Sequence, residues 1–133
     1  MNPTYLFDAS SLVKALKEAK LLPLGGQAVQ WLTIYEVLNA LWKEVHLLNK
    51  LSPKEASSLV EDFTDLLQEM IILDPKGLEQ DILRIAISKR ITAYDASYIA
   101  LAMKQGLTLI TEDKKLFQAA SDLIKVLSLD NIQ

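Results

Sequence analysis

The chain has 133 residues and a mass of 14.9 kDa, with half of its residues hydrophobic and 23% charged. A chain of this size usually folds as one domain, so we predict a single domain over residues 1–133. It contains no cysteine and one histidine, His46, which excludes disulfide scaffolds, cysteine-ligated metals and sites built from several histidines. The formal net charge of −3 disfavours a protein that coats nucleic acid through a generally basic surface.

No apolar run is long enough for a membrane span, and the N-terminal residues lack the basic and apolar regions of a secretory signal. We therefore expect a cytoplasmic protein without a membrane partner. Short apolar runs predict strands at residues 4–7, 28–32, 71–73, 107–111 and 125–129. Apolar residues that recur every three or four positions predict helices at residues 10–20, 33–48, 53–70, 78–90, 92–105 and 113–121.

Alternation of strands and helices favours an α/β fold of three layers, in which helices cover both faces of a central parallel sheet. The predicted strands are continuously apolar, as burial on both faces requires. Between Thr33 and Met70 two helices follow one another without a strand, which predicts a protruding helical hairpin. We expect Ser10 to cap the first helix, and Trp31, Trp42 and Phe63 to lie in the core.

Four acidic residues fall just after predicted strands or in the first turns of predicted helices: Asp8, Glu36, Asp95 and Asp113. In open α/β sheets, ligands bind beyond the carboxyl ends of the strands. Because all four acids are expected at this end of the strands, we expect their side chains to converge on one pocket.

Each acid has a simpler interpretation. Thr33 and Glu36, and likewise Thr92 and Asp95, have the spacing of capping pairs. Asp8 and Asp113 could be a turn residue and a helix cap. Together, however, converging carboxylates without a counter-charge repel one another, whereas Mg²⁺ or Mn²⁺ would stabilise them.

Such an ion can orient a water and neutralise the charge on a scissile phosphate, so the pattern favours metal-assisted hydrolysis of a phosphodiester. Without the four acids, the formal net charge would change from −3 to +1. Lys14, Lys114 and Lys115 lie close in sequence to these acids and are candidate contacts to a phosphate backbone.

The segments around the four acids resemble the PIN-domain ribonucleases, and in particular the VapC-type toxins of prokaryotic toxin–antitoxin pairs. These segments are Phe7-Asp8-Ala9-Ser10-Ser11-Leu12-Val13-Lys14, Glu36-Val37-Leu38-Asn39-Ala40-Leu41-Trp42, Thr92-Ala93-Tyr94-Asp95-Ala96-Ser97-Tyr98-Ile99-Ala100-Leu101-Ala102 and Leu109-Ile110-Thr111-Glu112-Asp113-Lys114-Lys115-Leu116. The Tyr-Asp-Ala and Thr-x-Asp parts are the most specific, and the resemblance covers essentially the whole chain.

The resemblance implies a PIN-like fold with five parallel strands, and an endoribonuclease that depends on Mg²⁺ or Mn²⁺. It implies catalytic and metal-binding roles for Asp8, Glu36, Asp95 and Asp113, and supporting roles for Ser10, Asn39 and Thr111. It also implies an RNA substrate, a homodimer and a cognate antitoxin whose C-terminal segment docks near the active site.

Two alternatives remain open. The segment Ile72-Leu73-Asp74-Pro75 could be the phosphoacceptor strand of a receiver-like signalling domain, although Asp8 lacks an adjacent acidic partner and Asp74 suits a turn before proline. Alternatively, the protein could be a non-catalytic binding module on a PIN scaffold, which would use the apolar faces of its long helices.

Overall fold

The computed structural model describes residues 2–132 and contains one five-stranded parallel sheet with the strand order β3-β2-β1-β4-β5. The strands are β1 (Tyr5–Phe7), β2 (Ala28–Gln30), β3 (Ile71–Leu73), β4 (Thr108–Ile110) and β5 (Val126–Leu127). The helices are α1 (Ala9–Glu18), α2 (Trp31–His46), α3 (Pro53–Leu67), α4 (Glu79–Lys89), α5 (Ala93–Gln105) and α6 (Lys114–Ala120). Two short 3₁₀ helices, η1 (Leu22–Leu24) and η2 (Leu129–Asn131), complete the described chain. The predicted parallel α/β class is confirmed.

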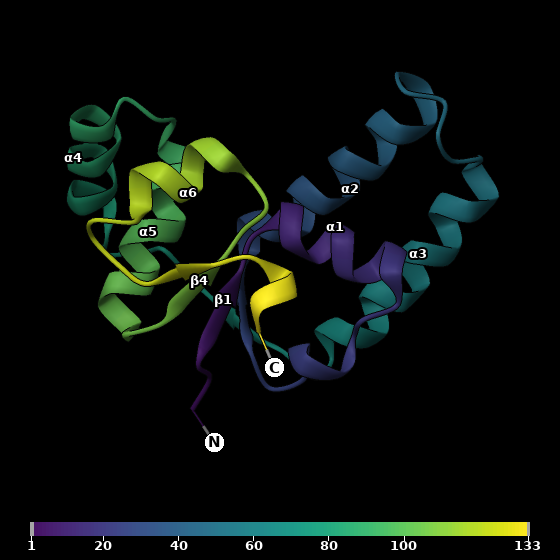
Figure 1. Ribbon diagram of the computed structural model, residues 1–133, viewed down its shortest axis with the longest axis horizontal. Helices are drawn as coiled ribbons and strands as arrows, with labels where there is room; N and C mark the ends of the chain where they lie inside the picture. Colours follow the sequence, from purple (N-terminus) through teal and green to yellow (C-terminus); the bar gives the residue numbers. More distant parts are fainter. Residues whose placement is uncertain (1, 133) are drawn as a thin grey trace.

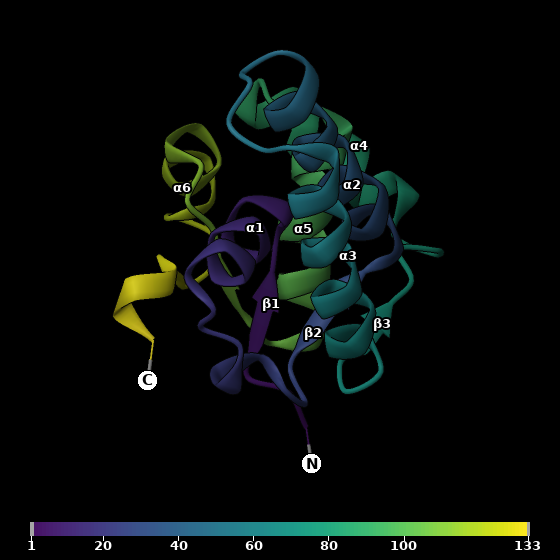
Figure 2. The same cartoon turned by 90° about the vertical axis from the view of Figure 1, so that its right-hand side faces the viewer.

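Helices cover both faces of the sheet, as the apolar strands require. Figure 1 shows α4, α5 and α6 on one side of the strands and α1, α2 and α3 on the other. In Figure 2, α2 and α3 lie in front of the neighbouring strands β1, β2 and β3. The predicted hairpin is formed by α2 and α3, which pack against each other and extend from the body of the molecule.

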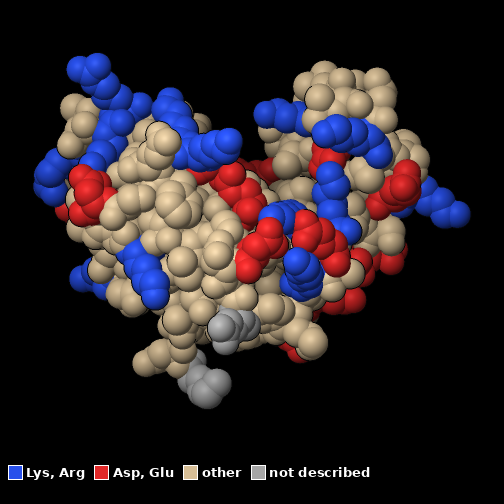
Figure 3. Space-filling view, viewed as in Figure 1, with Lys and Arg blue, Asp and Glu red and all other residues tan. Residues whose placement is uncertain are grey.

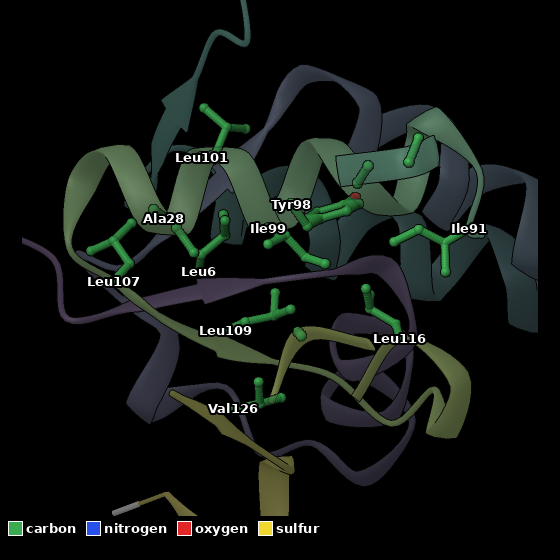
Figure 4. Close-up of a cluster of buried hydrophobic side chains, with 14 residues drawn as sticks. Leu6, Ala28, Ile91, Tyr98, Ile99, Leu101, Leu107, Leu109, Leu116 and Val126 are labelled. Atoms are coloured by element: carbon green, nitrogen blue, oxygen red, sulfur yellow. The ribbon is translucent and has the colours of Figure 1, made fainter. Parts of the chain in front are cut away.

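Two separate cores lie on the two faces of the sheet, because successive strand residues point to opposite faces. In β4, Leu109 faces the core under α5, and Ile110 faces the core under α1 and α2. In β1, Leu6 faces the core under α5, and Phe7 faces the core under α1 and α2. Figure 4 shows the first of these cores, in which Leu109 of β4 lies on the same face of the sheet as Ile99 and Tyr98 of α5.

Both long N-terminal helices begin earlier than the sequence pattern predicts. The α1 helix is capped by Asp8 rather than by Ser10, since the Asp8 side chain accepts a hydrogen bond from the Ser11 amide at 2.9 Å. The α2 helix begins at Trp31, directly after β2, so Thr33 and Glu36 do not form a capping pair across its start. The Thr33 hydroxyl instead accepts a hydrogen bond from the Gln30 amide at 3.2 Å.

The expectation of a buried position is correct for Phe63, which is 2% exposed, and wrong for Trp31 and Trp42. The two tryptophans are 53% and 50% exposed and lie on the outer side of α2. Their spacing follows the helical period, but α2 is part of a protruding hairpin that is covered on fewer sides than a helix of the central layer. Within residues 2–132, no helix combines the length and the apolar character that crossing a bilayer requires.

The sheet order places a crevice beside β1. From β1 the chain adds β2 and β3 on one side and later adds β4 and β5 on the other. The loops that follow β1 and β4 therefore diverge to opposite faces, and this switch point is where open α/β sheets bind ligands.

Candidate active site

A hollow of about 270 Å³ opens at the carboxyl ends of β1 and β4. All four acids that the sequence singles out contribute to its lining, which consists of Asp8, Ala9, Ser10, Glu36, Asn39, Ala40, Lys43, Asp95, Tyr98 and Asp113. Figure 3 shows acidic atoms in the depression between the two sides of the molecule and basic atoms on both of its rims. The tertiary structure thus brings together side chains that lie more than one hundred residues apart in the sequence.

Asp8 is the most rigidly held of the four acids. Its side chain accepts hydrogen bonds from the hydroxyls of Ser10, at 2.8 and 3.0 Å, and of Ser11, at 3.0 Å. The buried Thr111 hydroxyl donates to its second oxygen. Burial raises the pKa of the Asp8 carboxyl, and these hydrogen bonds oppose the rise by stabilising the ionised form.

Thr111 connects this acid to the loop after β4. Besides its bond to Asp8, its hydroxyl accepts a hydrogen bond from the Asp113 amide at 3.0 Å and lies 3.3 Å from the Ser10 hydroxyl. Asp113 also caps α6, because its side chain accepts the Leu116 amide at 3.1 Å. Asp113 therefore combines a capping role with a place in the hollow.

Glu36 and Asp95 form the other wall. Glu36 lies in the second turn of α2, and its Oε1 atom accepts a hydrogen bond from the Tyr98 hydroxyl at 2.6 Å. Asp95 lies in the first turn of α5, where its amide donates to the capping hydroxyl of Thr92 at 3.1 Å. No hydrogen bond to the Asp95 carboxylate occurs within residues 2–132.

Asp8, Glu36 and Asp95 lie in surroundings that disfavour their negative charge. Burial, together with the charges of Asp8 and Asp95, raises the pKa of Glu36 against the lowering effect of its bond from Tyr98. The pKa of Asp95 is raised by burial and by the charges of Asp113 and Asp8, with a smaller opposing effect of Lys115. In the described chain, no ion pair within 4.0 Å neutralises any of these four acids.

The residues present fit a hydrated divalent cation. Uncompensated carboxylate oxygens are the ligands that Mg²⁺ and Mn²⁺ prefer, and a cation would reverse the mutual repulsion described above. Among residues 2–132, no three acidic or histidine side chains are arranged so that they could together hold a metal ion directly. Mg²⁺ often retains several waters and needs only one or two carboxylates, so an open arrangement agrees with its chemistry.

The candidate lysines differ in their surroundings. The Lys14 ammonium pairs with Asp130 at 2.8 Å and with Glu112 at 3.3 Å, so it is engaged within the protein. Lys115 lies near enough to Asp95 to lower the pKa of that acid. Lys114 is exposed at the edge of an adjoining hollow of about 240 Å³, which also includes Asp113.

The sequence interpretation missed two polar residues of the hollow, Lys43 and Tyr98. Lys43 lies two turns after Glu36 on α2, which is the spacing of residues on one helix face, and this spacing was available as a signal. Tyr98 follows Asp95 by three residues on α5. Its side chain is 1% exposed, and its hydroxyl forms a hydrogen bond with Glu36.

Replacing Asp95 with Asn is expected to make the folded protein more stable at neutral pH. Folding raises the pKa of the Asp95 carboxyl above its ordinary value of 3.8. The protonated carboxyl therefore contributes fully to the stability of the fold below pH 3.8, and this contribution is lost as the pH rises through the pKa of the folded protein. Thermal melting of the wild type and of Asp95→Asn in metal-free buffer should give equal midpoints at low pH and a higher midpoint for the variant at pH 7.

The control for this comparison is Glu61→Gln, which removes an exposed acid on α3 outside the hollow. Its midpoint should track that of the wild type at every pH. An Asp95→Asn protein that melts below the wild type at pH 7 would show that repulsion at this site does not outweigh the other interactions of Asp95.

The family model of the PIN domain matches residues 5–122 of this chain. The exonuclease VapC9 of Pyrobaculum aerophilum is 33% identical over 136 residues, which cover 97% of this chain and 95% of that protein. The ribonuclease VapC3 of the same organism is 32% identical over 93 residues, or 70% of each chain. The crystal structure of PAE2754 from Pyrobaculum aerophilum superimposes with a TM-score of 0.80 at 30% identity, and the match covers 98% of this chain and 93% of that one.

Proposed function

Because the chain belongs to the PIN-domain family, we propose that it is a VapC-type toxin ribonuclease that uses Mg²⁺ or Mn²⁺ to hydrolyse phosphodiester bonds. One observation carries this proposal: four carboxylates from four separate segments line one hollow, and no ion pair in the described chain neutralises them. The names of the relatives support nuclease activity. The choice of metal ion and the endonucleolytic mode of cleavage are parts of the proposal.

The proposed roles follow from how each side chain is held. Asp8, Asp95 and Asp113 would chiefly hold the ion, and Glu36 would complete the site or orient the attacking water. The ion, when bound, would lower the pKa of a water and balance charge on the scissile phosphate. In-line attack of water on phosphorus would displace the 3′-oxygen and leave a 3′-hydroxyl on one product and a 5′-phosphate on the other.

The supporting residues act through the acids. Ser10 and Thr111 fix the orientation of the Asp8 carboxylate through their hydroxyl groups, and Thr111 also holds the amide of Asp113. Asn39 lines the hollow one turn after Glu36, where its amide could contact the substrate.

We propose that RNA crosses the hollow between basic rims. Lys43 lies on the α2 side, and Lys114 and Lys115 lie on the α6 side, so phosphates on either side of the scissile bond would meet positive charge. Lys14 can bind a phosphate only in exchange for its present acidic partners, which makes it the weakest of the candidates.

The test is cleavage of circular and linear single-stranded RNA by the purified protein. With Mn²⁺ or Mg²⁺ present, we expect both RNAs to be cut and the products to carry 5′-phosphates, while EDTA stops the reaction and added metal restores it. Cleavage of the linear RNA alone would favour an exonuclease, the activity in the name of VapC9. Cleavage that persists in EDTA, or no cleavage of either RNA, would contradict the proposed chemistry.

The alternatives make different predictions. A receiver-like domain would use Asp74, but this residue lies outside the hollow and its side chain accepts the Lys76 amide at 2.9 Å in a local turn. Stable phosphorylation of Asp74 by a small phosphodonor would support that function. A non-catalytic binding module would bind no divalent ion in calorimetry.

We also propose a cognate antitoxin and a homodimer as partners, and a cytoplasmic location where RNA is accessible. An exposed row of apolar side chains on α2 supports a protein partner on this helix. Its members recur with the helical period and are 41% to 74% exposed: Trp31, Tyr35, Leu38 and Trp42.

A further inference from the structure

At one wall of the hollow, a single side chain of α5, Tyr98, forms hydrogen bonds with two residues of α2. Thr33 and Glu36 are three residues apart on α2, and Asp95 and Tyr98 are three residues apart on α5. Residues at this spacing lie on the same face of a helix. The Tyr98 hydroxyl lies between the two residues of α2, 2.8 Å from Thr33 Oγ1 and 2.6 Å from Glu36 Oε1.

We propose that Tyr98 is a positioning residue that holds the Glu36 carboxylate in the hollow and fixes it relative to Asp95 on the same helix as Tyr98. This inference rests on the proposed function, because it assigns Tyr98 a role in placing one of the ion-binding acids. Nothing else restrains that acid in the same way: within residues 2–132, the bond from Tyr98 is the one hydrogen bond that the Glu36 side chain accepts.

The direction of the hydrogen bonds follows from their chemistry. An ionised carboxylate only accepts, so the single phenolic proton of Tyr98 points to Glu36. The Tyr98 oxygen must then accept from the Thr33 hydroxyl, whose own oxygen accepts the Gln30 amide. Three consecutive hydrogen bonds thus connect the Gln30 amide at the start of α2, through the hydroxyls of Thr33 and Tyr98, to the Glu36 carboxylate.

The buried position of Tyr98 fixes its hydroxyl relative to the half-buried Glu36 side chain. The ring is 1% exposed and lies among the buried side chains under α5 (Figure 4). Burial and the nearby Glu36 raise the pKa of the phenol far above its ordinary value, so the group remains a donor at neutral pH. Without this donor, Glu36 would be free to turn away from the negative charges of Asp8 and Asp95 and into solvent.

Tyr98→Phe removes the hydroxyl and keeps the ring, and Thr33 retains its bond from the Gln30 amide. We expect calorimetric titration of the metal-free protein with Mn²⁺ to show a Kd that is about 10–100-fold higher than in the wild type, the usual effect of losing an outer partner of a metal ligand. The matched control is Tyr5→Phe at the opposite end of β1, where the hydroxyl makes no hydrogen bond within the described residues. It should leave the Mn²⁺ Kd unchanged.

A double-mutant cycle tests whether Tyr98 acts through Glu36. In a Glu36→Gln background, Tyr98→Phe should weaken Mn²⁺ binding by no more than about 2-fold, because the carboxylate that it holds is gone. An equal loss in both backgrounds, or a Tyr98→Phe protein with wild-type Mn²⁺ affinity and only a lower melting temperature, would overturn the inference and leave the proposed function standing. A wild-type protein that binds no Mn²⁺ would overturn both.

Discussion

Asp95→Asn is expected to reduce metal-dependent RNA cleavage by at least about 100-fold, the scale on which loss of an electrostatic or metal contact slows an enzyme. The change keeps the size of the side chain and removes one negative charge from the hollow. Since the Asp95 carboxylate accepts no hydrogen bond in the described chain, the fold does not depend on its ionised form. The measurement is the initial rate of cleavage of a labelled single-stranded RNA at saturating Mn²⁺.

The matched control is Asp74→Asn, which makes the same chemical change just after β3 at the edge of the same sheet. Asp74 lies outside the hollow, so its variant should cleave RNA at the wild-type rate. Wild-type cleavage by Asp95→Asn would refute the assignment of this acid to the active site. Loss of activity in both variants would point to a general effect of acid removal at this edge.

Leu109→Ala is expected to lower the free energy of unfolding by about 3 kcal/mol, within the usual range for truncating a buried leucine. Leu109 is fully buried at the centre of β4, where it pairs with Leu6 of β1 on one side and with Val126 of β5 on the other. The substitution removes apolar contacts and leaves a cavity that three adjacent strands cannot easily close. Urea denaturation of the metal-free protein measures the effect.

Leu22→Ala is the control for this prediction, because Leu22 is 98% exposed and its truncation should change stability by less than about 0.5 kcal/mol. An unfolding midpoint of Leu109→Ala close to that of the wild type would mean that the sheet relaxes around the cavity. Such a result would contradict the assignment of Leu109 to a tightly packed core.

Local interactions made parts of the site predictable. Thr92 caps α5 as its position predicts, since its hydroxyl accepts the Asp95 amide. Asp113 caps α6 as well, and it also reaches the hollow. For Asp113, therefore, the capping interpretation is confirmed, while its role in the active site stays a prediction. The two are compatible, because a residue that follows a strand and begins a helix lies at the ligand-binding edge in either case.

Other local predictions failed where tertiary contacts decided the outcome. Ser10 was expected to cap α1, but its hydroxyl donates to Asp8 and Asp8 is the cap. Trp42 fits an apolar helical period, yet it is half exposed because no element of the described chain covers that side of α2. Periodicity shows that a helix has an apolar face and does not show whether this face meets the same chain.

The sequence by itself determined the parallel α/β class, the order of the elements and the position of the four acids at the same end of the strands. Each of these follows from short-range patterns: apolar runs, helical periods and residues at the ends of strands. The tertiary structure alone decided which distant side chains meet. The bond between Glu36 and Tyr98 spans 62 positions, and Lys14 pairs with Asp130 across 116. Such pairs depend on how helices pack against a common sheet, and the spacing of residues along one helix does not specify that packing.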